Sequence, residues 1–142
     1  FTTEEIYQLI FKDEKEESIH LQKFVKIPDQ WKNEELNKKW QKIKIIRDEA
    51  NISIESKRAE KIIGSSLEAN IEIKIKDKEL FSLAKNHDFS EICITSSASI
   101  YNDSNLEKEI EIVSSKAIGN KCPVCWKISK KICEKHGHLS VQ

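Results

Sequence analysis

The most constraining feature of the sequence is a cluster of cysteine and histidine residues near its C-terminal end. One pair is formed by Cys122 and Cys125 and a second by Cys133 and His136, each with two residues between its members. Zinc prefers four tetrahedral sulfur and nitrogen ligands, and a two-residue gap lets one tight turn direct both side chains at one ion. Pro123 fixes φ inside the first turn. We therefore predict one zinc ion bound by these two pairs.

Alternatives to this ligand set remain open. A redox pair or disulfide between Cys122 and Cys125 would need a βαβ context and would leave the second pair unexplained. His138 competes with His136 for the fourth position, and we favour His136 because its spacing mirrors that of the first pair. Three thiolates and a neutral imidazole leave no open coordination position, so we predict a structural site and not a catalytic one.

The length and composition limit the class of protein. A chain of 142 residues can form one or two small domains with a buried core. It contains no methionine and begins at Phe1, so we expect it to be part of a longer protein. No apolar run approaches the ~20 residues of a membrane span, and no signal peptide is recognisable. Thiols gathered for metal binding, with Cys93 alone elsewhere, indicate the cytoplasm.

Charge is balanced overall but not along the chain. The net charge is zero at pH 7, which argues against a general nucleic-acid-binding protein. Residues 36–58 nevertheless carry seven basic against three acidic residues, and residues 121–142 carry five against one. Most surface lysines serve solubility, but the lysines around the predicted zinc site could contact phosphate groups. They are Lys127, Lys130, Lys131 and Lys135.

The first 64 residues have a helical pattern. A Thr-x-x-Glu capping box predicts a helix over roughly residues 3–11, and an extended segment follows at residues 18–28. Residues 30–63 predict one long helix that ends at Gly64. A helix of this length needs a partner that the short helix cannot supply, so we expect further helices upstream. Its predicted apolar face comprises Leu36, Trp40, Ile43, Arg47, Ala50 and Ile54.

Arginine is rare in this chain. Arg47 and Arg58 are the only arginines among 24 basic residues. A guanidinium group in so lysine-rich a chain indicates a bidentate or buried role that an ammonium group cannot fill. Because Arg47 falls on the predicted apolar face, a packed ion pair, for example with Glu5, and a contact with RNA are both open.

The period of the pattern changes after Gly64. Residues 67–75 alternate between apolar and polar and predict a half-buried strand, and residues 78–87 predict a short amphipathic helix. Residues 92–94 are apolar on both faces and predict the start of a central second strand, in which Cys93 is a small buried apolar residue. Residues 107–116 alternate again and predict a third strand.

These elements predict an α+β fold, in which a helical segment with one long helix precedes a small β-α-β-β unit and a terminal zinc knuckle. We divide the chain into a helical part at residues 1–64, an α+β junction domain at residues 65–120, and a zinc-finger tail at residues 121–142.

Several short motifs follow one another in a characteristic order and spacing. They are found at residues 1–6, 18–21, 46–51, 57–69, 94–98 and 121–126. By these motifs the chain resembles, over nearly its whole length, the C-terminal end of bacterial-type isoleucyl-tRNA synthetases. The chain departs from the family in one respect, because the family's finger generally has two cysteine pairs and the second pair here is Cys133 and His136.

The resemblance implies a function for the longer protein. The family are class I ligases that use ATP to attach isoleucine to tRNA, and their catalytic and editing domains lie upstream. Neither the HIGH nor the KMSKS signature of the catalytic domain occurs here, so we assign no catalytic residue to this chain. The resemblance implies that residues 1–64 end the anticodon-binding helical domain. It also implies that tRNA-Ile and the upstream domains of the same protein are partners of this segment, and that ATP binds only to the upstream catalytic domain. We expect the protein to be a monomer.

The same resemblance points to residues that would hold the anticodon stem-loop. They are Arg47, Arg58, Lys121, Trp126, Lys127, Lys130 and Lys131. Trp126 offers a flat face on which an unpaired base can stack. The alternative is that its indole ring packs against the knuckle as a small core of the finger.

Two other classes of protein remain open. Some DNA glycosylases end in a related zinc finger, but they require a helix–two-turn–helix module before it, where this sequence predicts a β-α-β-β unit. A free-standing zinc-stabilised module would instead bind a protein or nucleic acid, with the apolar stripe of residues 36–54 as its contact surface.

Overall fold

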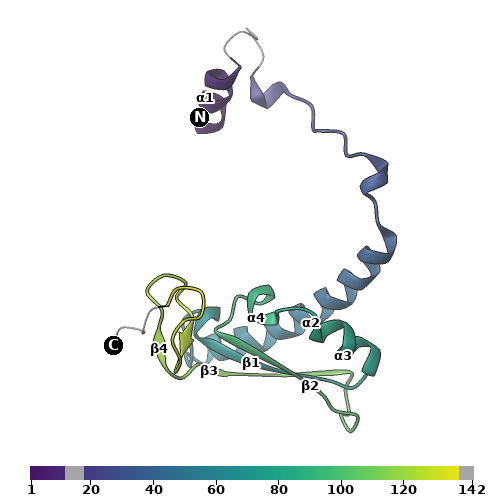
Figure 1. Ribbon diagram of the computed structural model, residues 1–142, viewed down its shortest axis with the longest axis vertical. Coiled ribbons are helices and arrows are strands. Elements are labelled where there is room, and N and C mark those ends of the chain that lie inside the picture. Colours follow the sequence, from purple (N-terminus) through teal and green to yellow (C-terminus); the bar gives the residue numbers. More distant parts are fainter. Residues whose placement is uncertain (12–17, 138–142) are drawn as a thin grey trace. The chain divides into compact units, whose positions relative to one another are not determined.

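The computed structural model describes residues 1–11 and 18–137, which form two compact units that divide between Asn33 and Glu34 (Figure 1). The first unit contains helix α1 (Thr2–Ile10) and two single 3₁₀ turns, Ile19–Leu21 and Asp29–Trp31.

Glu4 connects the elements of the first unit. Its carboxylate accepts hydrogen bonds from the Ser18 hydroxyl at 2.7 Å and from the Ile19 N–H at 3.0 Å. The hydrogen bond from Ser18 is the main reason why the pKa of Glu4 is lowered. None of the unit's described residues is buried, and several of its large apolar side chains are exposed. The described part of this unit therefore has no core of its own.

The long helix α2 (Glu34–Ala59) begins the second unit and is shorter than predicted. Its end is set by Lys61, which has φ 57°. The Lys61 N–H donates to the Arg58 carbonyl and the Ile62 N–H to the Lys57 carbonyl, which together form the Schellman pattern. The helix therefore stops before Gly64, because a lysine and not that glycine takes the left-handed position.

The buried face of α2 also differs from the prediction. It consists of Ile43, Ile46, Ala50 and Ile54, which join the core of the sheet. Arg47 is exposed and is not one of these buried residues, but its charge acts on the thiol of Cys93 in the core, so it lies on the side of α2 that faces the core. Leu36 and Trp40 are also exposed, at 49% and 40%, because the buried contacts of the helix begin only at Ile43.

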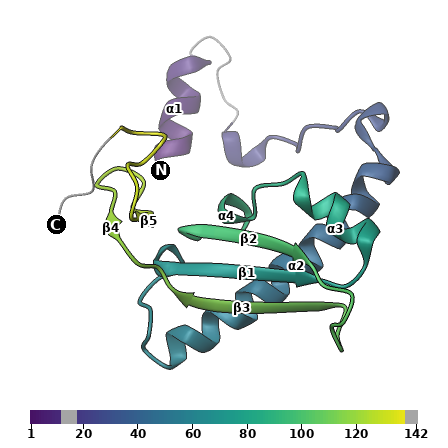
Figure 2. The ribbon, with the colours of Figure 1, turned by 60° about the horizontal axis from the view of Figure 1, so that its bottom comes forward.

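A three-stranded sheet carries the core of this unit (Figure 2). Strand β1 (Ala69–Ile75) lies in the middle, with β2 (Ser97–Asn102) parallel on one side and β3 (Ile110–Lys116) antiparallel on the other. Helices α3 (Lys78–Lys85) and α4 (Phe89–Ile92) form the crossover from β1 to β2. The predicted α+β class with a β-α-β-β unit is confirmed.

The prediction of a second strand at residues 92–94 is wrong. The Asp88 carboxylate accepts a hydrogen bond from the Ser90 N–H at 2.9 Å and caps α4, while Phe89 is only 1% exposed and anchors that helix. Ile94 then has φ 54°, which breaks an extended chain. The second strand consequently starts at Ser97 and lies at an edge.

Cys93 behaves as predicted. It is a free thiol, 4% exposed, in the apolar core beneath the sheet. Burial raises its pKa to about 11, so the thiol stays protonated and unreactive at neutral pH.

Helix α2 is also joined to β3 by a polar contact. The Ser114 hydroxyl donates to the Ser53 carbonyl at 2.8 Å, and the Ser114 N–H donates to the Ser53 hydroxyl at 3.2 Å. Ser114 is 3% exposed, and these bonds satisfy its polar groups in the core.

We call the sheet together with α2, α3 and α4, residues 34–117, the α/β layer. In the ranges that the structure describes, no helix is long and apolar enough to span a membrane.

The division of the chain at residues 64 and 120 stays a prediction. The contact of α2 with the sheet shows that residues on both sides of position 64 share one core.

We expect Ile73→Ala to lower the free energy of unfolding of the second unit by about 2–5 kcal/mol, because Ile73 is fully buried in the central strand. Val113→Ala is the matched control, since Val113 lies on β3 and is 46% exposed, and it should change stability by less than about 1 kcal/mol. Urea unfolding followed by circular dichroism measures both. Equal losses would contradict this description of the core.

Candidate metal centre

The chain leaves β3 and folds into a small finger, residues 119–137. Strands β4 (Asn120–Lys121) and β5 (Ile128–Ser129) pair antiparallel, so that residues 122–127 form the turn between them. Gly119 begins the finger with φ 138°, and a Cβ atom at this position would overlap the backbone of Ser129. Only glycine fits this close approach.

The first turn is fixed by its own backbone. The Cys122 N–H donates to the Lys127 carbonyl at 2.9 Å, and the Trp126 N–H donates to the Cys122 carbonyl at 3.0 Å. The second turn is closed by the Cys133 carbonyl, which accepts from the N–H groups of His136 and Gly137. Each turn thus holds one predicted pair of ligands.

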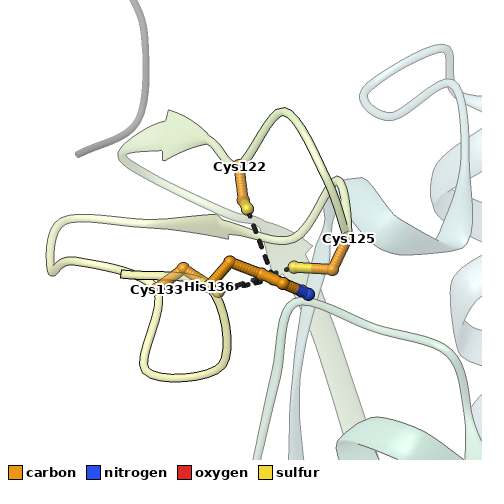
Figure 3. A group of neighbouring side chains, drawn as sticks. All are labelled: Cys122, Cys125, Cys133 and His136. Atoms are coloured by element: carbon orange, nitrogen blue, oxygen red, sulfur yellow. Dashed lines mark hydrogen bonds between the residues drawn. The ribbon is translucent and has the colours of Figure 1, made fainter. Parts of the chain in front are cut away.

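The structure brings all four predicted ligands together (Figure 3). Their donor atoms lie within 4.8 Å of one another. The His136 Nδ1 atom is 3.3 Å from the Cys133 sulfur and 3.7 Å from the Cys122 sulfur, and the sulfurs of Cys125 and Cys133 are 3.7 Å apart. Tetrahedral bonds of about 2.3 Å to sulfur and 2.0–2.1 Å to nitrogen place donors about 3.5–3.8 Å apart. The cluster therefore fits one tetrahedral metal ion.

The alternative to a metal site is a disulfide between Cys122 and Cys125. All three cysteines of the finger have free thiols. His138, the other candidate for the fourth position, lies outside the described residues. Four protein donors around one ion leave no position for a substrate, which is the arrangement of structural sites.

The surroundings of the cluster shift the pKa values of two of its thiols in opposite directions. The backbone N–H groups of Cys125 and Val124 lower the pKa of the Cys122 thiol to about 6, so this residue is largely a thiolate at neutral pH. The Lys127 N–H lowers the pKa of Cys125, but burial and the neighbouring thiols of Cys122 and Cys133 outweigh it, and the net shift is upward. A bound cation would remove this repulsion between sulfurs.

The predicted RNA-contacting residues fall into two groups. Lys121, Trp126, Lys127, Lys130 and Lys131 all lie in the finger, around the metal centre. Arg47 and Arg58 lie on α2, where Arg58 is paired with Glu55 at 2.7 Å. The pairing of Arg47 with Glu5 stays a prediction.

Two residues of the finger form a unit that the sequence did not predict. The Lys121 ammonium group lies over the Trp126 ring, 5.2 Å from its centroid. The indole is 57% exposed, and its backbone has φ 65°, a left-handed conformation that is rare for a bulky residue.

Glu91, at the end of α4, is a site residue that reasoning from the sequence missed. One of its oxygens, Oε1, accepts hydrogen bonds from both Lys127 and Lys135 at 2.8 Å. These lysines lie 36 and 44 residues away along the chain, so no local pattern could indicate the contact.

The chain is similar over most of its length to curated isoleucine–tRNA ligases. It is 60% identical to the enzyme of Pelagibacter ubique (strain HTCC1062) over 136 residues, which cover 96% of this chain and 14% of that protein. It is 37% identical to the enzyme of Agrobacterium fabrum (strain C58 / ATCC 33970) over 140 residues, covering 93% of this chain and 14% of that protein. The predicted resemblance to the isoleucyl-tRNA synthetases is confirmed. No protein-family model matches the chain.

The homology is to one segment of these ligases. The chain spans about one seventh of the length of these two relatives, 14% in each case. The β-α-β-β unit before the finger also occupies the place where the DNA-glycosylase alternative needs a helix–two-turn–helix module.

We expect Cys122→Ser to remove one donor, so that the bound metal falls from about one ion per chain to near zero, and the finger loses its fold. Circular dichroism should still show the cooperative unfolding of the α/β layer, whose core lies elsewhere. Elemental analysis measures the metal.

Cys93→Ala is the matched control, because Cys93 is the one described cysteine outside the cluster. It should keep the metal while lowering stability through the loss of a buried sulfur. Full metal content in Cys122→Ser would show that Cys122 is not a ligand.

Proposed function

We propose that this chain is the C-terminal part of an isoleucine–tRNA ligase and helps to bind the anticodon stem-loop of tRNA-Ile. The observation that carries the proposal is the 60% identity to one such ligase over 96% of the chain. The whole enzyme attaches isoleucine to tRNA-Ile with ATP, through domains outside this segment. Remote contacts of this kind serve the reaction by orienting a large substrate.

The proposed ion is zinc, with a structural role. Thiolate and imidazole donors in a tetrahedral arrangement select zinc over the oxygen-preferring ions magnesium and calcium. Within residues 119–137 only Cys122 is buried, so apolar packing cannot hold the finger together. Metal binding would supply that free energy instead.

The proposed base-stacking residue is Trp126. A left-handed backbone costs about 1–2 kcal/mol for a residue with a side chain, and glycine would avoid this cost. The exposed indole also gains little from burial. A strained backbone that presents an exposed aromatic ring supports a role in binding, more than the alternative in which the ring is the core of the finger.

The proposed phosphate contacts of the finger are Lys121, Lys130 and Lys131. Lys130 and Lys131 are exposed, in the segment after β5. Lys121 is exposed beside the Trp126 ring, so a cation and a stacking face are offered at one place. Arg47 and Arg58 remain proposed contacts on α2.

The proposed intramolecular partner is the rest of the ligase. Large apolar side chains of the first unit are exposed, among them Phe1, Leu21, Phe24 and Trp31. So much exposed apolar surface marks a contact surface, and about six sevenths of each relative's length lies outside the matched segment. We further propose a monomeric enzyme in the cytoplasm, where thiols stay reduced.

We expect Trp126→Gly to weaken the binding of tRNA-Ile about 5- to 150-fold, since one base–aromatic stack contributes about 1–3 kcal/mol. The same change should leave the melting temperature unchanged or raise it, because glycine accepts φ 65° without strain. Filter binding and thermal unfolding of the zinc-loaded chain measure the two effects. Val124→Ala is the control, since Val124 is 56% exposed in the same turn but has no ring.

A fall in melting temperature with unchanged affinity would favour the packing role of Trp126 and contradict the stacking role.

We expect the affinity for tRNA-Ile to fall as salt is added, with a slope of log K against log salt between about −2 and −4.5. The three lysines of the finger give about −2 to −3 if each neutralises one phosphate, at about 0.7–0.9 per contact, and contacts from Arg47 and Arg58 on α2 would make the slope steeper by the same amount each. Titrations between low and physiological salt measure it. Absence of binding even at low salt would contradict the proposed function for this segment.

A further inference from the structure

The finger is joined to the α/β layer by a small set of polar contacts, and most of them converge on α4. Lys127 belongs to the turn that holds the first ligand pair, and Lys135 lies between the two members of the second pair. Both ammonium groups donate to the same oxygen of Glu91, each at 2.8 Å. One carboxylate outside the metal centre therefore contacts both of the turns that hold the predicted ligands.

The position of Glu91 is fixed by the packing and the N-terminal cap of its helix, α4. It lies in α4, whose first residue, Phe89, is 1% exposed, and whose N-terminus is capped by Asp88. A second contact lies beside it, because the Ile128 N–H donates to the Ser96 hydroxyl at 2.6 Å. The Ser96 hydroxyl in turn donates to the Leu67 carbonyl in the α/β layer.

Lys127 makes two of the contacts between the finger and α4. Its ammonium group donates to Glu91 and also to the Ser90 hydroxyl at 2.9 Å, and its side chain is only 23% exposed. Its carbonyl accepts from the Cys122 N–H, inside the ligand turn. A movement of Lys127 would therefore move the metal-binding turn.

The space between finger and α4 does not favour an anion. A cavity of about 260 Å³ lies there, and its walls include three basic and three acidic side chains together with three of the four metal ligands. The charged residues are Lys127, Lys131, Lys135, Asp88, Glu91 and Glu134. Their charges cancel, so a phosphate group gains no net attraction there.

We propose that Glu91 is a positioning residue, which holds the finger in one orientation on the α/β layer for tRNA binding and keeps Lys127 and Lys135 from contacting phosphate. The role of orientation for tRNA rests on the proposed function. The docking of the finger does not, because it follows from the contacts themselves. Exposed ion pairs add little to folding stability, so the effect of Glu91 lies in geometry. The two lysines lower the pKa of Glu91 to about 2, so the carboxylate is charged at any physiological pH.

The test compares three variants of the full 142-residue chain loaded with zinc. Glu91→Gln should weaken tRNA-Ile binding about two- to tenfold, because the two lysines and the finger must then be ordered during binding. Glu91→Asp keeps the charge but is one methylene shorter and cannot hold both lysines, so it should weaken binding as well. Glu134→Gln is the control, because it also removes one negative charge but at a residue of the finger itself. It should leave the affinity for tRNA-Ile unchanged or raise it slightly.

Hydrogen exchange provides a readout that is independent of RNA. Exchange of the Ile128 amide should accelerate in both Glu91 variants at full zinc content and remain slow in Glu134→Gln. If the unaltered chain does not bind tRNA-Ile, the proposed function fails, and the exchange of Ile128 alone decides whether Glu91 docks the finger. Unchanged exchange, together with a rise in tRNA affinity in Glu91→Gln, would overturn the proposal.

Discussion

The proposed finger depends on one interaction, the binding of a metal ion by Cys122, Cys125, Cys133 and His136. Residues 119–137 contain a single buried residue, Cys122, and two strands of two residues each. Such a segment cannot offset the entropy of ordering its chain by apolar burial. A structural zinc ion contributes roughly 10–16 kcal/mol of apparent binding free energy, which is enough to order it. On this proposal the four side chains and their metal ion hold the finger together, as the isoleucine-rich cluster holds the α/β layer together.

Three devices of different kinds place the finger's surface. The proposed metal ion would hold its two turns, the backbone of Trp126 turns an indole ring to the outside, and Glu91 connects both turns to α4. The α/β layer supplies the rigid support, because α2 is packed and hydrogen-bonded to the sheet. The proposed binding of tRNA requires such rigidity, since movement at the contact reduces the binding energy that orients the substrate.

The parts of the fold that sequence could predict are those with a local pattern. Alternation predicted β1 and β3, and the two-residue spacing predicted the ligand cluster, because both patterns follow directly from side-chain geometry. Residues 92–94 were assigned to a strand on their apolar character, but Asp88 and Phe89 fold the preceding residues into a short helix. Glu91 could not be assigned a role at all, since its partners come from the finger. A tertiary contact of this kind leaves no periodic signal.

The central claim is that Cys122, Cys125, Cys133 and His136 bind one zinc ion. Zinc K-edge X-ray absorption on the chain purified without chelators, with its metal content measured in parallel, tests this most directly. The account predicts about one zinc per chain, with three sulfur ligands at about 2.3 Å and one nitrogen at about 2.0–2.1 Å. A chain without metal whose finger is nevertheless folded, or a zinc ion with oxygen ligands, would contradict it.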